Sequence, residues 1–133
     1  MNYRFQEELG KLLLRLTVGI LILFHGIGKI LNPAIVESIG TRLESDGWPA
    51  SVAYGIYLGE VLAPLLIVFG VLARIGGVLV AINMVFAIVL SHTAQILTLS
   101  KSGGWALELQ AFYLLGGIAI FLLGSGRMAV RPD

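Results

Sequence analysis

Four apolar windows of about 20 residues each most strongly constrain the fold of this chain. They cover residues 12–31, 52–72, 75–97 and 105–124. An α-helix of about 20 residues crosses the hydrocarbon core of a bilayer, and a helix satisfies its backbone polar groups internally. Charged residues make up 13% of the chain, against about 25% in soluble domains. The sequence therefore predicts an all-α polytopic membrane protein, a four-transmembrane-helix bundle that forms one domain over residues 1–133.

The ends of the chain and its basic residues predict how the bundle is oriented. Residues 1–11 are expected to be a short polar arm. The first window is expected to remain as a helix and not to be removed as a signal peptide, because it contains Arg15 and no small-x-small cleavage site follows it. In a four-span arrangement one side carries Arg4, Lys11, Arg15, Arg74, Arg127 and Arg131, and the other carries Lys29, Arg42 and Lys101. Because basic residues are retained on the cytoplasmic side, we expect both termini in the cytoplasm.

The one long connection lies between the first two windows. Within residues 33–45, Ile35, Ile39 and Leu43 recur every four residues with charged residues between them. This pattern predicts a short amphipathic helix lying on the outer membrane interface. Trp48, just before the second window, is placed as an interface anchor. The pattern leaves open whether this helix is a lid or a solvated connector.

Composition excludes several classes of function. A formal net charge of +1 argues against nucleic acid as a partner, because phosphate binding needs a basic surface. The chain has no cysteine, so it forms no disulfide and performs no thiol chemistry of its own. Gly55-x-x-x-Gly59 is a small-xxx-small motif, which favours close helix packing and offers only a weak surface for a homo-oligomer.

Polar side chains inside the apolar windows are the candidate functional residues. A charge in mid-bilayer costs about 2.5–3.5 kcal/mol on insertion scales, so such groups are expected to face the bundle interior and pair. Counting about 1.5 Å of rise per residue predicts two layers, His25 with Glu60 and His92 with Glu108. The long side chains of Lys29 and Arg15 are expected to extend to the outer and inner interfaces.

The neighbours of these pairs indicate the kind of ligand. Tyr57 shares a helix face with Glu60, and Trp105 shares one with Glu108. An aromatic ring, a carboxylate and an imidazole around an outward-facing cavity suit a flat, polar-headed molecule such as a quinone, and histidine as a residue type changes charge near neutral pH. The candidate ligand-binding or proton-relay residues are therefore His25, Lys29, Tyr57, Glu60, His92, Trp105 and Glu108.

Other interpretations of the same residues stay open. The pairs are equally compatible with structural polar clamps between helices, and Asn83 and Gln110 are expected to be interhelical hydrogen-bonding residues. Two histidines on different helices are compatible with haem ligation, or with a metal site together with the carboxylates. No dedicated haem or metal motif is present, so we expect neither group. No catalytic residue and no metal ligand is assigned.

The order and spacing of several motifs resemble the DoxX family of small four-helix membrane proteins. The matching features are Arg15, His25-Gly26-Ile27-Gly28-Lys29, Gly47-Trp48-Pro49, Gly59-Glu60 with Gly70, Arg74, His92 and the final Gly124-Ser125-Gly126-Arg127. The resemblance implies a location in a bacterial or archaeal cytoplasmic membrane. It also implies an association with quinone-linked oxidoreductases, such as thiosulfate:quinone oxidoreductase, and with assemblies that handle thiols and oxidative stress. Any thiol chemistry would then belong to a partner.

The leading hypothesis is a quinone-interacting subunit of a membrane oxidoreductase system, with a redox protein as its partner. The alternative is a non-catalytic membrane adaptor or assembly factor whose polar pairs are structural. A small transporter is a weaker third hypothesis, because four spans are few unless the chain dimerises.

Overall fold

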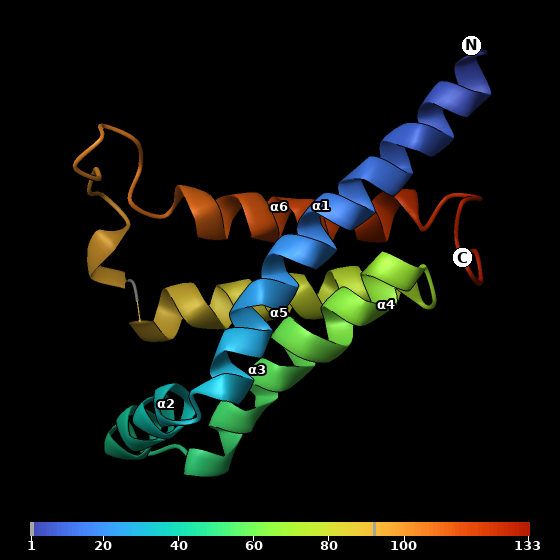
Figure 1. The fold of residues 1–133 in the computed structure, drawn as a ribbon. Helices are drawn as coiled ribbons and strands as arrows, with labels where there is room; N and C mark the ends of the chain where they lie inside the picture. The colour runs from blue at the N-terminus through green and yellow to red at the C-terminus, as the bar shows by residue number, and fades with distance from the viewer. Residues whose placement is uncertain (1, 92) are drawn as a thin grey trace.

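The computed structural model describes residues 2–91 and 93–133, and this part of the chain is helical with no β-strand (Figure 1). The elements are α1 (Tyr3–Leu31), α2 (Ala34–Ser45), η1 (Ala50–Tyr54), α3 (Gly55–Tyr57), η2 (Leu58–Leu62), α4 (Ala63–Phe69), α5 (Ala73–Ser91), η3 (Thr93–Gln95) and α6 (Glu108–Leu123). The predicted all-α class is confirmed.

Three stretches are long and apolar enough to cross a membrane: Tyr3–Leu31, Ala50–Phe69 and Ala73–Leu90. The fourth predicted span corresponds to α6, which has only 16 residues and falls short of the same criterion. The structure therefore supports three of the predicted crossings and does not confirm the fourth. The predicted polar arm is the first part of α1 in the structure. This helix begins at Tyr3, where the Asn2 side chain accepts a hydrogen bond from the Phe5 amide at 2.8 Å and caps the helix.

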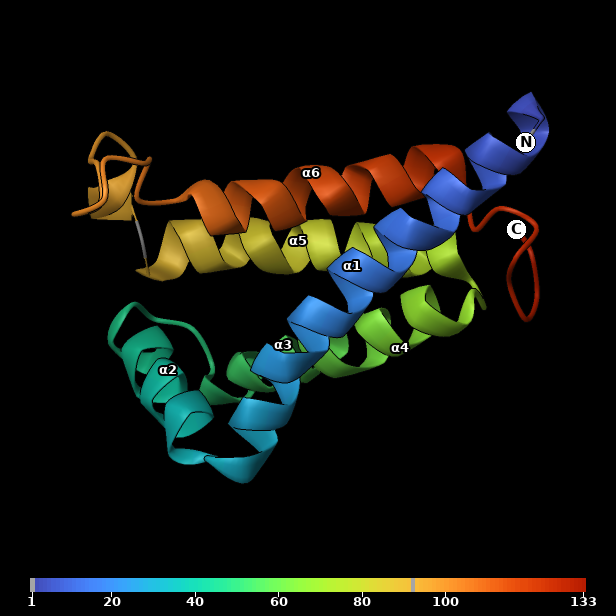
Figure 2. The same ribbon diagram turned by 45° about the horizontal axis from the view of Figure 1, so that its top comes forward.

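The helices pack as an antiparallel pair, α5 with α6, that is crossed by α1 and flanked by α4 (Figures 1 and 2). A Cβ atom at Gly77 of α5 would overlap the carbonyl oxygen of Gly117 in α6, so these glycines set the close approach of the pair. Buried side chains from four helices, including Ile22, Ile67 and Ile120, form the core. Both termini lie at the same end of the molecule (Figure 1).

The second span is interrupted by a turn of π-helix, η2. Pro64 has no amide hydrogen, so the carbonyl group of Glu60 lacks its usual donor four residues on. The hydrogen bonds change spacing here, and the Ala63 amide donates to the Leu58 carbonyl five residues back. The span then ends at Gly70, whose φ of +71° reverses the chain into α5.

Arg15 is buried in the structure, with 1% of its surface exposed. Its guanidinium donates to the carbonyl oxygens of Ile67, Val68, Ser125 and Met128 at 2.8–3.1 Å. The prediction that this side chain extends to the inner interface is wrong. The segment after α6 folds back onto the end of α4 and, with α4, supplies the carbonyl groups that pair the buried charge.

The predicted helix in the long connection is present as α2. Its buried face consists of Val36, Gly40 and Leu43, whereas Ile35 is 40% exposed. Gly40 lies against Ala50 at the start of η1, so α2 packs on the second span. Its location on the outer membrane interface stays a prediction.

Candidate functional site

A cavity of about 470 Å³ lies among α1, α5, α6 and the η1–η2 stretch, and α2 contributes to one wall. Most of its lining is aliphatic. The polar groups in the wall are His25, Lys29, Glu60, Asn83, Gln110 and Tyr113. A mainly apolar cavity of a few hundred Å³ with a few convergent polar groups is typical of a small-molecule site.

Two members of this polar cluster form an ion pair. The Lys29 ammonium lies 2.6 Å from the Glu60 carboxylate, and the two side chains are only 18% and 8% exposed. Gly26 permits the contact between helices, because a Cβ there would overlap the Glu60 carbonyl oxygen. Lys29 follows Gly26 by three residues and therefore shares its helix face. The predicted pairing of His25 with Glu60 is wrong, and so is the predicted outward extension of Lys29.

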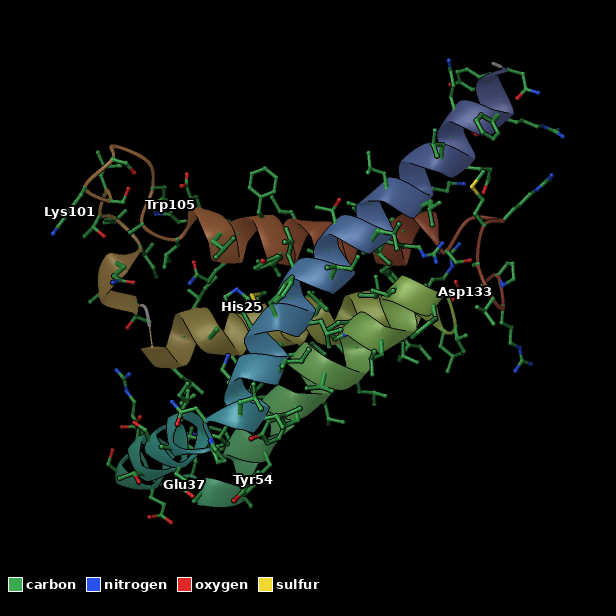
Figure 3. All side chains as sticks on the ribbon, viewed as in Figure 1. His25, Glu37, Tyr54, Lys101, Trp105 and Asp133 are labelled. Atoms are coloured by element: carbon green, nitrogen blue, oxygen red, sulfur yellow. The ribbon has the colours of Figure 1, made fainter. Side chains whose placement is uncertain are left out.

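His25 instead contacts an aromatic ring of α6. Its imidazole lies edge-on to Tyr113, with ring centroids 6.1 Å apart and an interplanar angle of 82°. His25 sits on α1 near the point where that helix crosses α5 (Figure 3). Both rings line the cavity, so the predicted imidazole and carboxylate do share one chamber without pairing directly. Tyr113 was not among the predicted residues, although its position one helical turn after Gln110 could have placed both on one face.

The two amide side chains line the cavity and were predicted to be interhelical hydrogen-bonding residues. Asn83 packs against Gly59, where a Cβ would overlap its side chain. The Gln110 Oε1 atom is buried without a hydrogen-bond partner among the described residues. A buried polar atom left unpaired costs about 1–3 kcal/mol. A ligand in the cavity that donates to this oxygen would remove that cost.

The remaining predicted residues lie outside the cavity lining. Tyr57 donates from its hydroxyl to the backbone carbonyl of Lys29 at 3.4 Å. The Trp105 indole donates to the Ile96 carbonyl at 2.7 Å. Glu108 is exposed and folds back over Gly104. His92 lies outside the described residues, so the second predicted layer, His92 with Glu108, stays a prediction.

No group of three or more histidine, aspartate or glutamate side chains within residues 2–91 and 93–133 is arranged to hold a metal ion.

The DoxX family model matches residues 10–93, which include the Lys29–Glu60 pair, His25 and Asn83. The chain belongs to the DoxX family. No solved structure matches it.

Two curated relatives cover most of this DoxX protein. "Putative oxidoreductase CatD" of Bacillus subtilis is 33% identical over 132 residues, which is 99% of this chain and 90% of the relative. "Uncharacterized membrane protein Rv3486" of Mycobacterium tuberculosis is 32% identical over 127 residues, which is 88% of this chain and 76% of the relative. Gln110 and Tyr113 lie beyond the segment that the DoxX family model matches, so α6 supplies cavity groups outside it.

Proposed function

We propose that this DoxX protein binds the head group of a quinone in the cavity and acts as the membrane subunit of an oxidoreductase system. The observation that carries the proposal is the polar cluster within an apolar cavity. An ion pair, an imidazole, a phenol and two amides converge there between helices rich enough in apolar residues to lie in lipid. The word oxidoreductase in the printed name of the Bacillus subtilis relative supports the same class.

The cavity groups divide between binding the head group and moving protons. A quinone carries two carbonyl oxygens, which accept hydrogen bonds from the Lys29 ammonium, the Gln110 amide and the Tyr113 hydroxyl. Reduction to the hydroquinone takes up two electrons and two protons. The Lys29–Glu60 pair and His25 are the groups placed to pass protons, and a partner protein with its own redox group supplies the electrons.

A structural role for the same residues is the second candidate, and one observation favours it. The Lys29–Glu60 pair joins α1 to the π-helical turn across 31 residues of sequence, as a clamp between helices would. A non-catalytic adaptor or assembly factor would retain this pair for stability alone. Substitutions in the pair would then lower stability without changing the affinity of the folded protein for any small molecule.

The proposed location is a bacterial or archaeal cytoplasmic membrane, with both termini in the cytoplasm. The position of the two termini at one end of the molecule supports this orientation (Figure 2). Arg74, Arg127 and Arg131 lie near that end, where α4 turns into α5 and the chain finishes. Basic residues are enriched on the cytoplasmic side of such proteins.

Quinone affinity in detergent or nanodiscs tests the proposal. We expect the purified protein to bind quinone and Glu60→Gln to weaken that binding by about tenfold, since a tenfold change corresponds to the loss of about one good polar interaction. Gln110→Leu removes a cavity group outside the ion pair and should also weaken binding. This second variant separates ligand contact from the stability of the pair.

Glu108→Gln is the matched control, because that carboxylate lies on α6 outside the cavity. It should bind quinone as the wild type does. Equal quinone affinity in the wild type, Glu60→Gln and Gln110→Leu would reject the proposal and leave the adaptor hypothesis.

A further inference from the structure

We infer that the cavity opens sideways into the bilayer between α3 and α5, and that its ligand is a head-and-tail molecule whose apolar chain lies in this opening. The opening, called the portal below, is lined by Val52, Gly55, Leu58, Ile82 and Phe86. The inference deepens the proposed function, since it rests on that proposal for the head group and adds the tail and its route.

The portal residues belong both to the cavity wall and to the molecular surface. Val52, Leu58, Ile82 and Phe86 line the cavity, yet they are 39–52% exposed. A residue with both properties marks an edge where the cavity reaches the outside. All four side chains are apolar, and all four lie in stretches that are long and apolar enough to cross a membrane. The outside that this edge meets is therefore hydrocarbon.

Two glycines one helical turn apart explain why the helices part at this level. At Gly59 the second span touches α5, because a Cβ there would overlap Asn83. At Gly55 an added Cβ would meet no atom within 4 Å, although this residue also lines the cavity. The second span and α5 therefore touch at Gly59, and the absence of a side chain at Gly55 leaves a gap between them. Gly59 is buried against Asn83 of the same chain, so only Gly55 of the predicted Gly55-x-x-x-Gly59 motif lies on the surface.

A second edge of the cavity has a different chemical character. It is marked by His25 of α1 and Leu109 of α6, which are both exposed and both line the cavity. An imidazole on the rim suits contact with a polar group or a proton more than with a hydrocarbon chain. The Ile39 and Leu43 side chains of α2 form part of another wall. The portal between α3 and α5 is the edge with a wholly apolar rim.

The chemistry of both ends then specifies the ligand. The head must satisfy polar groups such as Gln110 Oε1, which has no partner among the described residues. The tail remains in contact with lipid and portal side chains, so its apolar surface never has to enter water. A quinone with an isoprenoid chain meets both requirements, because the hydroxyl groups of its reduced form donate to Gln110 Oε1. A water-soluble ring without a chain meets only the first requirement.

Gly55→Leu closes the portal with little disturbance of the fold. The backbone at Gly55 is helical, with φ −58° and ψ −21°, and the new side chain starts in open space. The matched control is Gly28→Leu, which also meets nothing within 4 Å but lies outside the cavity lining. Each variant is compared with the wild type in nanodiscs for two quinones that share a ring, one with an isoprenoid chain and one without.

We expect Gly55→Leu to weaken binding of the long-chain quinone by about tenfold, while the tail-less quinone and the Gly28→Leu control stay within about twofold of wild type. Equal weakening of both quinones would place the introduced side chain in the head-group site and overturn the portal. Unchanged binding of both would overturn the portal and leave the head-group proposal standing. A third outcome is that Leu109→Trp abolishes binding of the long-chain quinone while Gly55→Leu leaves it unchanged. This result would assign the route to the α1–α6 edge and overturn the portal.

A second measurement does not depend on quinone. Lipids with a photoactivatable diazirine in the acyl chain are expected to form adducts on the cavity residues Asn83 and Ala87 in the wild type, and Gly55→Leu should remove them. If no quinone binds but these adducts form and are lost in Gly55→Leu, the proposed function fails while the portal stands. Absence of cavity adducts in the wild type would overturn the inference. This also holds if a second copy of the chain is found to cover the portal residues.

Discussion

At the scale of single residues, Lys29 and Glu60 have two consequences for the protein. A buried ion pair adds little net stability compared with apolar side chains of similar size, because both charges lose their hydration. Breaking such a pair is costly, however, since one charge is left without a partner in a low-dielectric environment. The pair is therefore poorly explained by stability alone, and its position in the cavity wall is consistent with a role in binding.

We expect Lys29→Met and Glu60→Met each to lower the free energy of unfolding by about 3 kcal/mol, because each leaves one unpaired charge in the cavity wall. The double variant should recover most of this loss, to within about 1 kcal/mol of wild type, since no charge remains unpaired. Unfolding of all four proteins in one detergent measures the cycle. Losses that simply add in the double variant would contradict the coupling.

At the scale of elements, the contact between α1 and the π-helical turn determines which residues face the cavity. Pro64 removes a donor and η2 forms, and the Glu60 carbonyl oxygen then lies against Gly26. The absence of a side chain at Gly26 lets α1 come close enough for Lys29 to reach Glu60. The spacing of residues along one helix would not by itself predict this pairing. The distance between two helices depends on the size of the residues at their contact, here Gly26.

Gly26→Ala should destabilise the protein by about 1–3 kcal/mol, because the new methyl group would overlap a backbone oxygen that cannot rotate away. Gly28→Ala is the matched control in the same helix. Its added methyl group meets nothing within 4 Å, so the change should be neutral or stabilise the helix by up to about 1 kcal/mol. Thermal unfolding of the two variants in parallel checks the contrast. Similar behaviour of both would show that α1 and η2 are not in close contact.

At the scale of the whole molecule, the position of the termini constrains the number of membrane crossings. The N-terminus, the C-terminus and the turn between α4 and α5 lie at one end, and the connection that contains Lys101 lies at the other (Figures 1 and 3). Arg15 and Asp133 hold the last residues at this end, since Asp133 accepts hydrogen bonds from the amides of Arg74 and Ser125. From this arrangement we predict that α6 returns across the membrane despite its 16 residues.

The cysteine-free chain permits a direct test of the crossing. Single cysteines in Asn2→Cys and Arg131→Cys should react with a membrane-impermeant maleimide from the same side of oriented vesicles. Lys101→Cys should react only from the opposite side. Reaction of Lys101→Cys and Arg131→Cys from one common side would show that α6 does not cross.

The sequence by itself determined the helical membrane class and the helix between the first two spans. Among the polar residues that line the cavity, it predicted His25, Lys29 and Glu60 as candidate ligand-binding or proton-relay residues. These properties follow from local periodicity and from the length of apolar windows, so they need no knowledge of neighbouring helices. His25 and Lys29 lie one turn apart on the same face. Counting depth along the helices favoured His25 as the partner of Glu60, whereas Lys29 takes that place in the structure.

Only the tertiary structure decided that partner, because the choice depends on the shift in hydrogen bonding at Leu58–Leu62 and on the close approach at Gly26. The same holds for Arg15. Its burial requires carbonyl groups from Ile67 and Ser125, which are more than 50 residues away in sequence. A pattern of hydrophobicity describes one helix at a time, whereas the pairing of a buried charge is a property of several segments brought together by the fold.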